Sequence, residues 1–147
     1  MQFREGQVIV SEGNRKSLIS KGIAFYTGSW ATHAFIYVGN GQGVEATFPR
    51  VRYLDVNKRI EELKRENRAF VVLELPGITD DLRTAVARKA ETYVGRFYDV
   101  GQLLVYMLLG KFWKDGTGTL VCSRLVTAAH YSVGEVLFDE ETLAKYY

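Results

Sequence analysis

Short runs of apolar, aromatic and β-branched residues, separated by glycine-rich or charged segments, divide the chain into predicted strands and helices. Runs of about four to eight such residues are typical of strands. The strongest turn signal, Gly39-Asn40-Gly41-Gln42-Gly43, lies between two of these runs and predicts a hairpin over residues 32–48. The pattern as a whole predicts strands over residues 7–10, 32–38, 44–48, 51–54 and 69–75, the last of them buried.

Apolar residues at helical spacing predict the other elements. Residues 55–68 are dense in charge and carry a thin apolar stripe, which predicts an exposed helix with a solvated charged face. Strands grouped with helices in this way predict an α+β fold, an antiparallel sheet packed against helices, in one domain spanning residues 1–147. Further helices are predicted over residues 17–26, 79–95, 99–109, 140–146 and from Cys122 to about residue 131.

Composition excludes several classes of function. The chain has 147 residues, of which 47% are hydrophobic and 24% charged, as expected of a soluble globular protein. Its net charge of +2 does not indicate a nucleic-acid partner. The sequence has no Cys-X-X-Cys pair, no Cys/His cluster at metal-ligand spacing and no phosphate-binding glycine loop. We therefore expect neither a metal nor another cofactor.

The sequence predicts neither a signal peptide nor a transmembrane segment. The first residues, Met1 to Gly6, lack the apolar core of a signal peptide. The most apolar stretch, residues 100–109, is much shorter than the about 20 residues that span a bilayer. The single cysteine excludes an internal disulfide and fits a reducing compartment. We expect a soluble protein with no integral membrane segment, cytoplasmic unless another route delivers it.

That cysteine, Cys122, lies where a glycine- and threonine-rich loop is predicted to become a helix. The positive end of a helix dipole lowers the pKa of a thiol there and favours the nucleophilic thiolate. The backbone N–H of the same residue would be placed to stabilise an oxyanion. The alternative is a buried structural cysteine, because Leu125, Val126 and Ala129 follow at helical spacing and free cysteines are often buried.

Two histidines could act as the general base that a cysteine nucleophile needs. His33 lies early in the predicted strand over residues 32–38, where it could equally be a structural histidine that makes one hydrogen bond. His130 lies eight residues after Cys122, about 12 Å along the same predicted helix. That separation is too large for contact with the thiol, so we predict His33 as the base and His130 as structural.

A third group is expected to orient the histidine. If the hairpin loop centres on Asn40, Glu45 pairs with Phe35 and shares a face of the sheet with His33. A slip of one residue would turn Glu45 to the other face, where it would be an ordinary exposed carboxylate. Asp55 and Asp99 are weaker candidates for the same role.

Five segments, in this order, resemble the circularly permuted papain-like hydrolases, the YaeF/YiiX-like relatives of the NlpC-type cell-wall peptidases. In that family the histidine-bearing strands precede the cysteine-bearing helix. The resemblance implies a permuted papain-like fold with Cys122 as nucleophile at a helix N-terminus, His33 as base and Glu45 as the third residue. The matching segments are Gly6-Gln7-Val8-Ile9-Val10, Thr32-His33-Ala34-Phe35-Ile36-Tyr37-Val38-Gly39, Val44-Glu45-Ala46, Gly95-Arg96-Phe97-Tyr98-Asp99 and Val121-Cys122-Ser123-Arg124-Leu125-Val126.

Three positions depart from the family pattern. Gln7 stands where aspartate is usual, Thr32 where serine is common, and Arg124 where the motif often has glutamate. None of them removes the nucleophile or the base, although Arg124 could alter substrate preference. The resemblance also places Tyr98 near the site, where its phenol could bind substrate or the oxyanion. Tyr98 could instead be an aromatic packing residue, since the chain has nine tyrosines.

Together these residues predict a thiol hydrolase that cleaves an amide or ester bond through Cys122, His33 and Glu45. The resemblance suggests peptide-like substrates, such as cell-wall peptides, or small acyl compounds. An acyltransferase would use the same residues with an amine or alcohol in place of water. The remaining alternative is a binding or structural protein that retains the fold without catalysis, for which the charged residues 57–68 could supply a partner surface.

Overall fold

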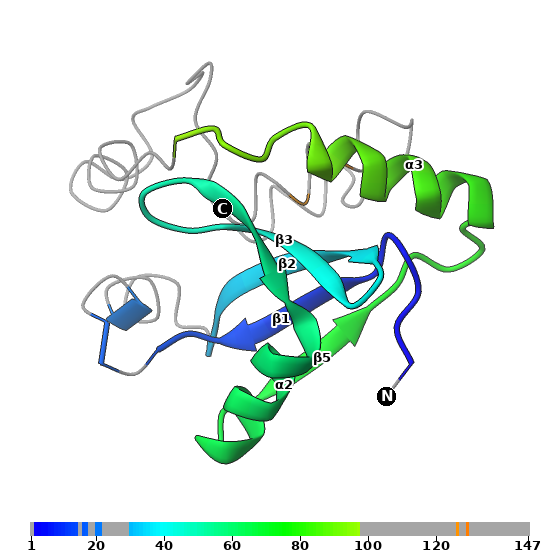
Figure 1. The fold of residues 1–147 in the computed structure, drawn as a ribbon. Helices are drawn as coiled ribbons and strands as arrows, with labels where there is room; N and C mark the ends of the chain where they lie inside the picture. Colours follow the sequence, from blue (N-terminus) through cyan, green and yellow to red (C-terminus); the bar gives the residue numbers. More distant parts are fainter. Residues whose placement is uncertain are drawn as a thin grey trace, which may run out of the picture.

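A computed structural model describes residues 2–14, 16–17, 20–21, 30–97, 126 and 129. In this part of the chain, five strands form one antiparallel sheet with the order β4-β3-β2-β1-β5 (Figure 1). The strands are β1 (Val8–Glu12), β2 (Ala31–Gly39), β3 (Gln42–Ala46), β4 (Val51–Asp55) and β5 (Phe70–Leu73).

The predicted hairpin is confirmed, with a tighter turn than the sequence indicated. Gly39 pairs with Gln42, which leaves Asn40 and Gly41 as the connecting residues. Both have positive φ, +51° and +75°, as two-residue hairpin turns favour. β3 therefore begins at Gln42, two residues before the predicted start, and ends at Ala46, before Pro49, which has no N–H for the ladder.

The last predicted strand is present but is not buried. β5 pairs with β1 and ends the order of strands in the described sheet. Its residues alternate in exposure, and Val71 and Leu73 turn toward solvent at 41% and 51% exposure. The apolar run over residues 69–75 suggested burial on both sides, whereas one face of an edge strand can be apolar and exposed.

Two predicted helices are confirmed with shorter bounds. The helix α2 (Val56–Arg65) begins after Asp55, whose side chain accepts a hydrogen bond from the Lys58 N–H at 2.9 Å. The helix α3 (Asp80–Glu91) begins after Thr79, which caps it in the same way, and continues as a turn to Gly95. Such caps satisfy backbone donors that have no partner inside the helix. No helix among the described residues is both long enough and apolar enough to cross a bilayer.

The sheet separates two layers of core. On one side, α3 supplies Val86, Ala87 and Ala90, which pack against Ile36 of β2 and its neighbours. On the other side, α2 supplies the predicted stripe of Val56, Ile60 and Leu63, which packs with Ile9 and Phe35. Figure 1 shows the two helices on opposite sides of the sheet. Because side chains alternate along a strand, the odd-numbered residues of β2, His33 among them, lie on the α2 side.

Several predicted elements fall outside the described residues. They include the helices over residues 99–109 and 140–146 and nearly all of the helix over residues 17–26, of which Ser20 and Lys21 are helical. From the predicted Cys122 helix, Val126 and Ala129 are described; both are helical and buried in the layer that contains α3. A single domain over residues 1–147 stays a prediction.

Candidate active site

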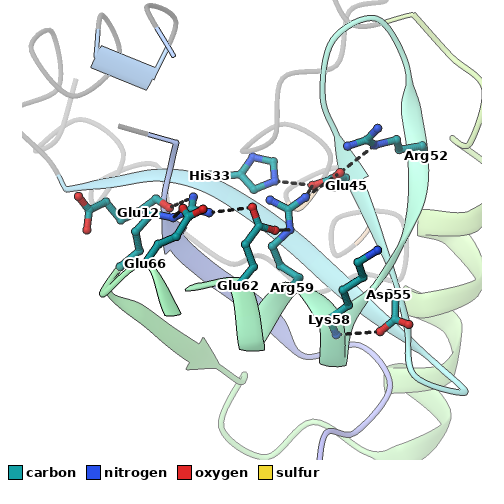
Figure 2. Close-up of polar contacts among 10 residues, drawn as sticks. Glu12, His33, Glu45, Arg52, Asp55, Lys58, Arg59, Glu62 and Glu66 are labelled. Atoms are coloured by element: carbon teal, nitrogen blue, oxygen red, sulfur yellow. Dashed lines mark hydrogen bonds and ion pairs between the residues drawn. The ribbon is translucent and has the colours of Figure 1, made fainter. Parts of the chain in front are cut away.

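His33 and Glu45 form a direct contact between neighbouring strands. Glu45 of β3 pairs with Phe35 of β2, so the predicted register is confirmed. His33 lies two residues before Phe35 on the same face, and its Nε2 atom lies 2.7 Å from Oε2 of Glu45. The carboxylate thus reaches the ring diagonally across the hairpin, as Figure 2 shows.

Two arginines also bind the Glu45 carboxylate. Arg52 lies directly opposite Glu45 on β4, and its Nε donates to Oε1 at 2.9 Å. Arg59 reaches across from α2 and donates to Oε1 at 3.3 Å and to Oε2 at 3.2 Å. In Figure 2 the carboxylate lies between the His33 ring and Arg52, with Arg59 approaching from the helix. Glu45 is only 1% exposed, so an ordinary exposed strand carboxylate is excluded.

The surroundings of Glu45 keep it ionised. Burial alone would raise its pKa. The hydrogen bond and charge of His33, the charge of Arg59 and the hydrogen bond from Arg52 outweigh burial and lower the pKa from 4.5 to about 2. A carboxylate with so low a pKa can only accept hydrogen bonds at neutral pH.

The ionised carboxylate also selects the tautomer of His33. Because Glu45 can only accept, Nε2 of His33 must carry the proton of the 2.7 Å hydrogen bond. In the neutral ring Nδ1 then has the lone pair and is the basic nitrogen. The His33 side chain is 17% exposed, and its ring lies tilted against that of Phe35 with centroids 6.3 Å apart. The ring is therefore oriented by a hydrogen bond on one side and by packing on another.

Neither Arg52 nor Arg59 was predicted from the sequence to lie at this site. Residues 55–68 were expected to present a solvated charged face, but two of the arginines there turn inward. Arg59 contacts Glu45, and the buried Arg68 donates to the backbone oxygen of Glu12 at 3.2 Å and pairs with Glu62 at 3.3 Å. Signals for Arg59 and Arg52 were present: Arg59 adjoins the apolar stripe of α2, and Arg52 opposes Glu45 once strands 44–48 and 51–54 are paired.

Other predicted site residues fall differently. Asp55 caps α2 through its side chain. This contact accounts for the carboxylate at position 55, so no role in orienting His33 is needed for it. Five predicted site residues lie outside the described residues: Cys122, Tyr98, Asp99, His130 and Arg124. Val126, four residues after Cys122, packs into the core layer that contains α3, whereas the His33–Glu45 pair lies on the α2 side of the sheet. Within the described ranges, no three His, Cys, Asp or Glu residues converge as metal ligands would.

Comparisons with known proteins support the fold. No family model matches the chain, and no curated protein matches it. Among solved structures, metalloprotein yiiX from Escherichia coli O157:H7 is similar, with a TM-score of 0.67 and 19% sequence identity. The match covers 90% of this chain and 67% of that one. At this identity the likeness shows the fold alone. The chain therefore has a yiiX-like α+β fold, in which the described helices cover the two faces of an antiparallel sheet.

Proposed function

We propose that this chain is a cysteine hydrolase with a permuted papain-like fold, in which Cys122 attacks an amide or ester carbonyl. The observation that carries the proposal is the contact between His33 and the buried, ionised Glu45. A histidine whose tautomer is fixed by a carboxylate is the arrangement that activates a nucleophile. Among the described residues His33 is oriented in this way, and the single cysteine of the sequence follows it in the order that the family resemblance requires.

In the first step the Cys122 thiol gives its proton to Nδ1 of His33 as Sγ bonds to the carbonyl carbon. The carbonyl electron pair moves to oxygen, and Glu45 stabilises the imidazolium that forms. When the tetrahedral intermediate collapses, the bond to the leaving nitrogen or oxygen breaks. Nδ1 returns its proton to that atom, and the acyl group stays on Cys122 as a thioester.

In the second step a water molecule takes the place of the leaving group. Nδ1 of His33 removes a proton from the water as its oxygen bonds to the thioester carbon. The C–S bond then breaks, Nδ1 returns that proton to the departing sulfur, and the carboxylic acid is released with the thiol and the neutral ring restored. The proton on Nε2 stays hydrogen-bonded to Glu45 throughout, so Nδ1 carries out every proton transfer. The two arginines support this step indirectly, because they keep Glu45 ionised.

The proposal sets a geometric requirement. Val126 and Ala129 pack on the α3 side of the sheet, whereas His33 is the third residue of β2 on the other side. The thiol must therefore meet the ring at the end of the sheet where β2 begins, beyond the core that these two residues fill. The proposal therefore needs the predicted start of the helix, rather than its middle, to approach that end; Cys122 precedes Val126 by four residues in the sequence.

The likeness to a metalloprotein raises metal-dependent hydrolysis as an alternative. The described residues do not fit it, because the guanidinium groups of Arg52 and Arg59 lie on both oxygens of Glu45. A divalent cation there would compete with two fixed positive charges. The donor set around His33 suits a proton-transfer pair, and the proposed mechanism uses no metal.

Profiling with acyl and peptidyl electrophiles tests the nucleophile and the substrate together. We expect wild-type protein to react covalently with at least one electrophile of either class and Cys122→Ala to react with none, because the replacement removes the only thiol. Intact-protein mass spectrometry counts the adducts. Ser123→Ala is the matched control, since it removes the adjacent hydroxyl nucleophile and keeps the thiol.

The electrophile that reacts fastest indicates whether the substrate is peptide-like or a simple acyl compound. Turnover of the corresponding amide or ester by wild type, but not by Cys122→Ala, would support hydrolysis. Adducts that form equally on Cys122→Ala, or only on a residue other than Cys122, would contradict the proposed nucleophile and favour a binding or structural role.

A further inference from the structure

The two most exposed large apolar side chains in the described part of the chain lie on adjoining segments at the start of β4. Phe48, in the loop between β3 and β4, is 64% exposed, and Phe97, after α3, is 68% exposed. Arg50 forms a backbone bridge with Phe97, and its guanidinium carbon lies 4.4 Å from the centre of the Phe97 ring. Figure 1 shows the segment that follows α3 running past the loop.

Two more basic side chains lie beside these phenylalanines, on the ring of Tyr93. The guanidinium carbon of Arg96 is 4.8 Å from the ring centre and Nζ of Lys89 is 5.7 Å from it. The Arg96 carbonyl accepts a hydrogen bond from the Val51 N–H at 2.9 Å, which holds this segment against the start of β4. We call these six residues the basic-aromatic cluster: Phe48, Arg50, Lys89, Tyr93, Arg96 and Phe97.

The three cations of the basic-aromatic cluster keep their positive charge. Their charged groups contact aromatic rings, and none of them forms an ion pair with a carboxylate in the described part of the chain. The two neighbouring arginines are neutralised instead, because Arg52 pairs with Glu45 at 2.9 Å and Arg88 with Glu91 at 2.8 Å. The cluster thus holds an excess of three positive charges, although the whole chain has a net charge of +2.

An anionic bilayer surface matches both features of the cluster. Anionic headgroups attract basic side chains, and an exposed aromatic side chain gains free energy when it enters the boundary between headgroups and acyl chains. The guanidinium of Arg50 is weakly hydrated and stays attracted to the Phe97 ring when water is removed, so the two side chains can enter this boundary together. Single-stranded nucleic acids also bind cations and stack on aromatic rings, but Arg50 already covers one face of the Phe97 ring.

We propose that the basic-aromatic cluster docks the protein on an anionic lipid bilayer, with Phe48 and Phe97 inserted among the headgroups. The contact is peripheral and uses no membrane-spanning segment. It depends neither on Cys122 nor on the proposed hydrolysis, so the two proposals are tested separately.

Sedimentation with lipid vesicles tests the role of the cations. We expect wild type to bind vesicles of phosphatidylcholine and phosphatidylglycerol in equal parts, and to bind phosphatidylcholine alone much more weakly. Affinity for the anionic vesicles should fall about 10²-fold in the triple variant Arg50→Gln/Lys89→Gln/Arg96→Gln, about fivefold for each charge lost. The matched control removes three exposed charges from α2, on the opposite side of the sheet from α3, and should lose no more than about threefold because salt screens distant charges. This control is Lys58→Gln/Lys64→Gln/Arg65→Gln.

A second variant, Phe48→Ser/Phe97→Ser, separates a bilayer from a soluble polyanion. Its affinity for the anionic vesicles should fall at least about tenfold, because two apolar side chains no longer leave water on binding. Its binding to heparin, which has no hydrocarbon phase, should equal that of wild type. Leu73→Ser, at a side chain of β5 that is 51% exposed, is the control and should bind vesicles as wild type does.

Three results would overturn the proposal. The first is a wild-type protein that does not bind the anionic vesicles, and the second is an equal loss of affinity in the α2 control. The third is vesicle binding that survives Phe48→Ser/Phe97→Ser, which would assign the basic-aromatic cluster to a soluble polyanion such as a nucleic acid. Urea unfolding of each variant checks that its fold is intact, as expected for substitutions of side chains that are at least partly exposed.

Discussion

Replacing His33 with alanine is expected to lower kcat by about 10²- to 10⁴-fold, the range that general acid–base catalysis contributes. The substitution removes the group that takes the thiol proton and later protonates the leaving atom. It also removes the Nε2 contact with Glu45 at 2.7 Å. Steady-state kinetics on the amide or ester selected by electrophile profiling measure the effect, with KM changing much less than kcat.

His130→Ala provides the matched control, because the chain has only two histidines. The predicted helical spacing separates His130 from Cys122, so we expect kcat to stay within about twofold of wild type. A similar loss of kcat in the two variants would show that His33 has no special role. A loss confined to His130→Ala would assign the base to the other histidine.

Replacing Glu45 with glutamine is expected to remove about 3 kcal/mol from the free energy of unfolding at pH 7. In wild type the pKa of Glu45 is about 2 in the folded protein and is taken as the ordinary 4.5 in the unfolded chain. This difference corresponds to about 1.4 kcal/mol for each tenfold change in proton affinity. Glutamine keeps the size of the side chain but has no charge for Arg52 and Arg59 to bind.

The sign of the pH dependence follows from the lowered pKa. Between about pH 2 and pH 4.5 the unfolded chain binds more protons at this position, so wild-type stability rises with pH across that window and then levels off. Urea unfolding from pH 2 to pH 7 should show wild type and Glu45→Gln converging at the acid end and separating above pH 4.5. Glu61→Gln, at an exposed carboxylate of α2, should stay within about 0.5 kcal/mol of wild type. Parallel curves for wild type and Glu45→Gln would contradict the lowered pKa.

The hairpin and its polar pair were predictable because they depend on local rules. A glycine-rich loop fixes the turn, the turn fixes the register, and the period of two along a strand puts His33 and Glu45 on one face. The glycine-rich loop is also compatible with a register shifted by one residue. The observed two-residue turn at Asn40 and Gly41 removes that ambiguity.

The arginine contacts could not be predicted in the same way. Whether Arg59 faces solvent or the sheet depends on how α2 rotates when its apolar stripe packs on Ile9 and Phe35, which is a tertiary effect. The exposure of β5 has a similar origin, because an apolar run does not reveal whether a second layer covers it. The role of Cys122 rests on the family resemblance and on its predicted place at a helix start.

The alkylation rate of Cys122 with iodoacetamide, measured from pH 5 to pH 9 in wild type and His33→Ala, tests the central claim most directly. The account predicts that wild type reacts much faster near neutral pH, and that His33→Ala falls to the rate of an ordinary thiol with a pKa near 8.5. Equal rates in the two proteins across this range would show that His33 does not activate Cys122, and would contradict the proposed hydrolase function.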